Sequence, residues 1–221
     1  TPKGAYGETL RGPAQVQGRH KTQSGGRGQF GDCWVEFAPL ERGAGYEFED
    51  AVVGGVVPRQ YIPAVDKGIQ EACARGFLAG YPMVDFRAKL YDGSYHSVDS
   101  SEMAFKVAGS LAFKKAMETC KPTLLEPIVT LTISIPDENM GDVIGDLSSR
   151  RGKVSGSDSI AGITEIKAQV PMNEVLRYAP DLRSMTGGQG SFTMEFSHYE
   201  EAPQPVTEKV VAEYKAAKEG E

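Results

Sequence analysis

One short polar segment contains the three residue types of a hydrolytic triad. Ser94, His96 and Asp99 lie close together in the sequence. A triad needs the imidazole between the nucleophile and the carboxylate, with an oxyanion hole beside them, and neighbours on one loop rarely reach that geometry. We therefore expect no catalytic residue here. His96 is expected to be an exposed contact or a solvated loop residue, and Asp99 is expected to cap the following helix.

A second segment is rich in glycine. Gly26 to Gly31 fits G-x-G-x-x-G, but a dinucleotide site needs these glycines to open a helix, and the residues after Gly31 predict a strand. A protein-kinase loop does lie between strands, yet the V-A-I-K, H-R-D and D-F-G motifs are missing, and so is a Walker A motif. Two interpretations remain. The segment is either a hairpin tip that brings Arg27 and Phe30 close to another backbone, or a flexible turn.

The sequence gives no support for metal or disulfide chemistry. Cys33, Cys73 and Cys120 are far apart without a C-x-x-C pair, and the three histidines lack the spacing of a metal motif. We expect reduced structural cysteines, no metal and no cofactor in this chain. The apolar runs are too short to span a membrane, so a cytoplasmic protein without membrane contact is expected.

The net charge of -6 is unevenly distributed along the 221 residues. Residues 1–122 contain 15 Lys and Arg against 14 Asp and Glu, whereas residues 123–221 contain 9 against 16. A stretch between Thr9 and Gly31 has no acidic residue and contains Arg11, Arg19, Lys21 and Arg27. Such a basic strip can face phosphate, or it can be an ordinary solvated strand surface.

The elements that position these segments follow from hydrophobic periodicity. Alternation predicts strands at 14–23, 33–37, 46–53 and 84–91, with a turn at Asp92-Gly93. Helical spacing predicts helices at 59–75 and 103–117. We expect residues 1–122 to form one mixed β-α domain.

Residues 123–221 are expected to form a second domain. A strand from about Leu124, a helix capped by Asp137 and ended by Gly152, a hairpin at 153–157 and 163–170, a helical segment at 172–184 and a strand at 191–197 give the order β-α-β-β-α-β. That order is the ferredoxin-like pattern. A last helix follows Pro203 and is expected to dock through Val206, Val210, Tyr214 and Ala217. The predicted fold class is α+β with two domains.

Several long motifs, in order and spacing, carry a family resemblance. In the first half these are Gln23 to Gly31, Val53 to Val65 and Tyr91 to Lys106; in the second they are Leu125 to Ile128, Met140 to Leu147, Arg150 to Gly152 and Ala179 to Ser184. They resemble domains IV and V of elongation factor G, and they cover nearly the whole chain. The resemblance implies a non-catalytic, ribosome-binding C-terminal part of a translational GTPase.

The resemblance also implies partners and a site. It implies that domain IV enters the ribosomal A site on the small subunit during translocation, near rRNA, tRNA and mRNA. It implies that domain V lies against the large subunit. GTP and Mg²⁺ are expected in N-terminal GTPase domains of the same protein. The two loops expected to form the RNA-contacting tip contain Ser24, Gly25, Gly26, Arg27, Gly28, Gln29, Phe30, Ser94, Tyr95, His96, Ser97 and Asp99.

Two residues depart from the family pattern. Gln189 stands where the family usually has Arg, and Gly7 stands where Arg is also usual. A paralogue specialised in ribosome recycling or another ribosome-associated step is therefore an alternative. A further alternative is a protein-interaction module that uses the acidic second half, which the sequence pI of about 5.2 favours.

Overall fold

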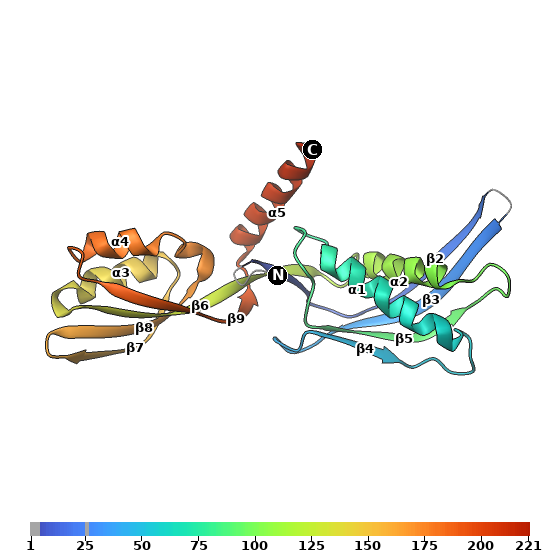
Figure 1. Cartoon of the computed structure of the whole chain (residues 1–221), viewed down its shortest axis with the longest axis horizontal. Coiled ribbons are helices and arrows are strands. Elements are labelled where there is room, and N and C mark those ends of the chain that lie inside the picture. The colour runs from blue at the N-terminus through green and yellow to red at the C-terminus, as the bar shows by residue number, and fades with distance from the viewer. Residues whose placement is uncertain (1–4, 25–26) are drawn as a thin grey trace. The chain divides into compact units, whose positions relative to one another are not determined.

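The chain forms two compact units. The computed structural model describes residues 5–24 and 27–221, without the side chain of Ser24. The N-terminal unit comprises Gly7–Leu125 and Glu201–Glu221, and the ferredoxin-like unit comprises Glu126–Glu200 with the described residues before Gly7. Both units pack helices on a sheet, which confirms the predicted α+β class (Figure 1). Within the described ranges, no helix is both long and apolar enough to cross a membrane.

The N-terminal unit contains a four-stranded sheet. Its strand order is β2-β3-β5-β4, formed by Ala14–Ser24, Arg27–Pro39, Phe86–Ser94 and Tyr46–Asp50. β4 runs parallel to β5, and the other pairs are antiparallel. A short strand that sequence patterns did not predict, β1 (Gly7–Leu10), pairs with the first residues of β6 (Pro122–Pro136).

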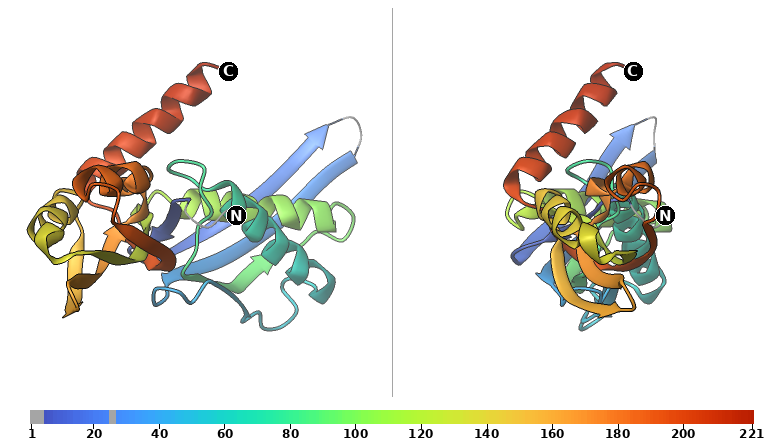
Figure 2. Two further views of the ribbon diagram at one scale, coloured as in Figure 1. Left: turned by 60° about the vertical axis from the view of Figure 1, so that its left-hand side comes forward. Right: turned by 90° about the vertical axis from the view of Figure 1, so that its left-hand side faces the viewer.

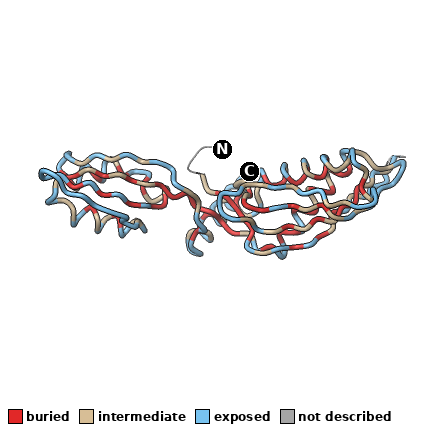
Figure 3. The backbone as a smooth tube through the Cα atoms, turned by 90° about the horizontal axis from the view of Figure 1, so that it is seen from below, coloured by how far each residue is buried: buried red, intermediate tan, exposed pale blue. Residues whose placement is uncertain are grey.

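Two helices cover one face of this sheet (Figure 2). A 3-10 turn, η1 (Arg59–Tyr61), leads into α1 (Ile62–Arg75), and α2 (Glu102–Ala116) packs on β2 and β3. The core beneath them is apolar, and Figure 3 shows its buried segments, in red, distributed along the strands and helices. Gly31 lies where α2 crosses β3, and a Cβ there would be 2.4 Å from the carbonyl oxygen of Ala104. Glycine is therefore required for the close approach of helix and strand.

The ferredoxin-like unit has the predicted β-α-β-β-α-β order. Its sheet order is β9-β6-β8-β7. The elements after β6 are η2 (Asp137–Asn139), α3 (Met140–Ser149), β7 (Lys153–Ile160), β8 (Ile163–Pro171), η3 (Met172–Glu174), α4 (Tyr178–Met185) and β9 (Ser191–Glu201). Leu131, Ile133, Val143 and Leu147 are in its core, so the alternation in the strand and the helical spacing in α3 are both satisfied.

Two local predictions in this unit were wrong. Asp137 does not cap a helix; its carboxylate accepts hydrogen bonds from the hydroxyls of Ser159 and Thr164, at 2.7 and 2.6 Å, and so holds the β7–β8 hairpin. α3 ends at Ser149 before Gly152, and Arg151 is the residue with positive φ (60°). The Arg151 guanidinium makes two hydrogen bonds of 2.8 Å with the buried Glu126 carboxylate, which holds Arg151 in this position.

The last helix, α5 (Gln204–Glu219), lies in the N-terminal unit, not with the residues of the predicted second domain. The amide of Ala202 donates to the carbonyl oxygen of Leu124 at 2.9 Å, and the ring of Tyr214 lies against Gly80. Val210 is the one buried residue of the predicted apolar stripe. The division of the chain into two family domains, residues 1–122 and 123–221, remains a prediction.

Candidate nucleic-acid interface

Two loops lie together at one end of the N-terminal unit. They are the end of the β2–β3 hairpin and residues 95–101, which connect β5 to α2 (Figure 1). Phe30 and Ser100 form a parallel bridge, and the Phe30 amide donates to the carbonyl oxygen of Asp99 at 2.9 Å. We call the described residues of the hairpin end, 19–24 and 27–32, and the loop 95–101 together the tip. The predicted meeting of the two segments is present in the structure.

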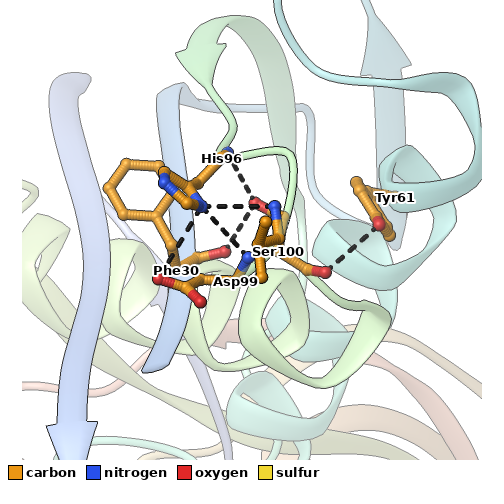
Figure 4. A network of polar contacts seen from close by, with 6 residues as sticks. Phe30, Tyr61, His96, Asp99 and Ser100 are labelled. Atoms are coloured by element: carbon orange, nitrogen blue, oxygen red, sulfur yellow. Dashed lines mark hydrogen bonds and ion pairs between the residues drawn. The ribbon is translucent and has the colours of Figure 1, made fainter. Parts of the chain in front are cut away.

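Ser100 is the central hydrogen-bonding residue of the tip (Figure 4). Its hydroxyl donates to the carbonyl oxygen of Phe30 at 2.9 Å and accepts from the amide of His96 at 2.9 Å. The Ser100 amide donates to the His96 carbonyl oxygen at 3.1 Å, and the Tyr61 hydroxyl donates to the Ser100 carbonyl oxygen at 3.3 Å. One half-buried serine therefore fixes the loop to both the hairpin and the start of α1.

The ring of His96 is oriented by its own loop. Nδ1 accepts hydrogen bonds from the amides of Val98 and Asp99, at 3.2 and 3.1 Å. A neutral imidazole that accepts at Nδ1 carries its proton on Nε2. The His96 side chain is 54% exposed, so it can present this N–H to an acceptor in solution. The ring of Phe30 lies beside it, with centroids 6.5 Å apart.

Asp99 has a different role from the predicted helix cap. Ser101 is the N-cap of α2, because its hydroxyl accepts from the Ala104 amide at 3.1 Å. The Asp99 carboxylate lies 3.7 Å from Nδ1 of His96 and against Gly28, where a Cβ would be 2.7 Å from a carboxylate oxygen. A side chain at position 28 would therefore displace the Asp99 carboxylate from the hairpin.

One face of the hairpin combines cations with an aromatic ring. The Arg19 guanidinium lies over the Phe30 ring, 5.6 Å from its centroid. Lys21 pairs directly with Phe30 in the β2–β3 ladder, so the two share this face. Arg19 and Lys21 belong to the basic strip, but the sequence did not place them at the site. Arg19 and Lys21 are two residues apart in a predicted strand, which places both side chains on one face. This spacing is the signal that could have identified them as site residues.

The opposite face of the hairpin presents other polar groups. Nε2 of His20 and Oε1 of Gln29 are 2.7 Å apart. Arg27 is exposed and lines a polar groove of about 350 Å³ with Gly28, Gln29 and residues 98–101, the end of the loop before α2. Arg27 and the loop that carries His96 therefore meet at one groove.

The remaining predicted residues divide into exposed and structural ones. Tyr95 is 52% exposed, and Ser97 is also exposed. The Ser94 hydroxyl donates to the buried Asp32 carboxylate at 2.6 Å, so it is used inside the protein. Ser24 pairs with Arg27 in the hairpin ladder. Gly25 and Gly26 lie outside the described residues.

The structure differs from the predictions at the expected Asp92-Gly93 turn and in the extent of the basic strip. Asp92 and Gly93 belong to β5 and pair with Trp34 and Cys33; the local irregularity is a bulge at Tyr91, not a turn. Arg11 is not part of the tip, because its guanidinium contacts Glu201 at 3.6 Å and Thr123 at 3.2 Å at the other end of β2.

The geometry gives no support to a hydrolase. Nδ1 of His96 is occupied by two amides, and the Ser94 hydroxyl is bonded to Asp32. No group of three His, Cys, Asp or Glu side chains suited to a metal ion occurs among the residues described. Burial raises the pKa of the Cys33 thiol to about 12, which disfavours the nucleophilic thiolate.

Comparison with known proteins covers both units. The family model for elongation factor G, domain IV, matches residues 2–121, and the model for the elongation factor G C-terminus matches residues 123–210. A crystal structure of a protein from Thermus thermophilus is similar at 45% sequence identity with a TM-score of 0.88. The match covers 97% of this chain and 32% of that protein, so the chain spans about a third of its length.

Proposed function

The chain belongs to the elongation factor G family, and we propose that it is the RNA-facing C-terminal module of a translocase. It contains the domains IV and V of a translation elongation factor. In the proposal, the tip enters the ribosomal A site on the small subunit, where it promotes movement of tRNA and mRNA. The chain itself performs no catalysis.

The junction between the hairpin and the loop is the observation that carries the proposal. Ser100 fixes the loop to Phe30, so the loop that carries His96 is held beside a hairpin that presents Arg19 on one face and Arg27 on the other. Guanidinium groups suit phosphates, the Nε2–H of His96 suits an RNA oxygen, and the exposed Tyr95 can stack on an unpaired base. These are the contacts that distorted or single-stranded RNA requires.

The acidic character of the whole chain is compatible with this role. The chain has a net charge of -6, but the basic residues of the tip lie on one hairpin. We propose that other domains of the same protein bind GTP and Mg²⁺ and bind the ribosome, and so raise the effective concentration of the tip at the A site. The isolated chain should then bind ribosomes weakly and lose binding steeply as salt increases.

A translocation assay tests the proposal. The full-length protein that contains this chain is added to pre-translocation ribosomes, and the puromycin reactivity of peptidyl-tRNA is measured. Rapid GTP-dependent reactivity without a second factor supports the proposal. The absence of reactivity, with ribosome binding intact, would contradict it.

A recycling factor is the second candidate. Gln189 is exposed between α4 and β9, beside Gly187 and Gly188 with positive φ. An uncharged amide makes a weaker phosphate contact than a guanidinium. Splitting of post-termination ribosomes, without translocation activity, is the result that identifies this alternative. Binding to a protein with no effect on ribosomes would identify a protein-interaction module.

A further inference from the structure

A groove lies between the first turns of α1 and α2, outside the tip. Its volume is about 500 Å³, and its lining includes Pro63, Ala64 and Lys67 from α1 and Glu102, Met103 and Lys106 from α2. The helices meet closely beside it, because a Cβ on Gly68 would be 2.0 Å from the carbonyl oxygen of Lys106. Its position is therefore set by a rigid helix contact.

The groove combines an apolar wall with a free cation. Met103 is 59% exposed, and Pro63, from α1, is also exposed in the groove. Lys106 pairs with Glu71 at 3.0 Å, whereas Lys67 is exposed and has no ion-pair partner among the described residues. Glu102 adds one carboxylate that can accept hydrogen bonds.

The tip and the groove are adjacent along the chain and in space. The tip loop ends at Ser101, the N-cap of α2, and Glu102 and Met103 follow directly. Tyr61, which precedes α1, donates to the carbonyl oxygen of Ser100. Tyr61 also stacks on Phe105, with ring centroids 4.9 Å apart. An extended ligand that contacts the tip loop can therefore continue into the groove.

We propose that this groove binds one unstacked nucleotide of a single-stranded RNA, in addition to the contacts of the tip. The inference rests on the proposed RNA-facing function. The base lies on Met103 and Pro63, and Lys67 holds the adjacent phosphate. The Glu102 carboxylate accepts from an exocyclic amino group, which favours cytosine over uracil because uracil has no such group. The charge and the two apolar side chains favour a nucleotide over an acidic peptide, which lacks a flat base.

Methyl NMR of the full chain tests this proposal. The methionines are labelled at the methyl carbon, the Met103 signal is assigned with Met103→Leu, and buried Met117 at the end of α2 is the internal control. Oligocytidylate, oligouridylate and an acidic peptide are titrated separately. We expect a saturable Met103 shift with RNA, stronger with oligocytidylate, and an unchanged Met117 signal.

Charge variants give a second measurement. On single strands, each phosphate contact contributes roughly 0.7 to the slope of the logarithm of the binding constant against the logarithm of the salt concentration. Loss of one contact therefore corresponds to about fivefold weaker binding at 0.1 M salt. Lys67→Ala should show this loss, whereas Lys114→Ala, an exposed lysine in the last turn of α2, should not. Glu102→Gln should reduce the preference for oligocytidylate.

The outcomes separate the groove from the tip. RNA binding that Arg27→Ala weakens, with no Met103 shift, overturns the groove proposal and leaves the proposed function standing. A Met103 shift that Lys67→Ala weakens, with Arg27→Ala and His96→Ala inert, supports the groove and counts against the tip. A Met103 shift with the acidic peptide alone overturns the proposal in favour of a protein partner.

Discussion

The hydroxyl of Ser100 donates to the carbonyl oxygen of Phe30 at 2.9 Å, across 70 positions of sequence. The same hydroxyl accepts from the amide of His96. One side chain therefore connects the glycine-rich hairpin to the loop that presents the imidazole.

Ser100→Ala should loosen the tip loop while the unit stays folded. The substitution leaves the Phe30 carbonyl and the His96 amide without their partner, at a cost of about 1 to 3 kcal/mol in local opening. Hydrogen exchange at the His96 amide measures this opening. Ser97→Ala is the control, because Ser97 is exposed in the same loop and its hydroxyl has no hydrogen bond among the described residues. Equal exchange in the two variants would contradict the assigned role.

Two substitutions of His96 separate its two nitrogens. His96→Asn keeps an acceptor near the Nδ1 position, so we expect an ordered loop with slow translocation. His96→Gln keeps a donor near the Nε2 position, so we expect a looser loop with partly restored translocation. Loss of the hydrogen bond to RNA should slow translocation by about 10-fold to 100-fold, the effect of a hydrogen bond with a charged partner.

The control for this pair is His198→Ala, a half-buried histidine in the ferredoxin-like unit. It should leave the translocation rate of the full-length protein unchanged. If His96→Asn is as active as the parent protein, the Nε2–H group does not contact RNA.

Glu8→Gln should destabilise the N-terminal unit strongly. The buried carboxylate of Glu8 accepts four backbone N–H groups from Phe77, Leu78, Ala79 and Tyr81, at 2.7 to 3.0 Å. The side-chain amide of Gln would place its two N–H donors against these backbone N–H donors. We therefore expect a loss of about 3 kcal/mol in the free energy of unfolding. Urea denaturation measures it. Glu47→Gln, exposed in β4, should change little; comparable losses would refute the role of Glu8.

The stability of the ferredoxin-like unit should depend on Asp137 at acidic pH. Hydrogen bonds from Thr164 and Ser159 hold the pKa of Asp137 below its ordinary value. The pKa of Asp137 is lower in the folded state than in the unfolded state. Its contribution to the stability of this unit is therefore complete above the unfolded pKa and is lost as pH falls through the folded pKa. Carboxyl NMR titration should show an upward shift of the midpoint in Thr164→Val and none in Thr132→Val. An unchanged midpoint in Thr164→Val would contradict this cause.

Local periodicity was enough to predict the main elements. Val65, Ile69 and Ala72 in α1 lie on its buried face, as their helical spacing requires, and Cys33, Val35 and Phe37 in β3 alternate as predicted. These patterns depend on which residues face one core. The four-residue strand β1 has no such pattern, because its burial is created by pairing with residues far along the chain.

Local chemistry was less informative where several residues fit one role. Asp99 and Ser101 are both good N-caps, and only the path of the loop decides that Ser101 makes the contact. Asp137 fits a cap as well, but its carboxylate faces a hairpin whose position is set by the sheet. In the tip, the contact of Arg19 with Phe30 depends on hairpin register, which the basic strip alone does not specify.

Directed cleavage from the tip tests the account most directly. In the full-length protein, Ser97→Cys gives an exposed thiol for an iron chelate, while Cys33, Cys73 and Cys120 are buried and should not react. Exposed cysteines elsewhere in that protein are first removed. With the factor bound to ribosomes, the tethered iron should cleave rRNA of the small subunit, together with mRNA, around the A-site codon. Ribosome binding without cleavage at the A site, or cleavage only elsewhere, would contradict the claim that this tip meets the decoding RNA.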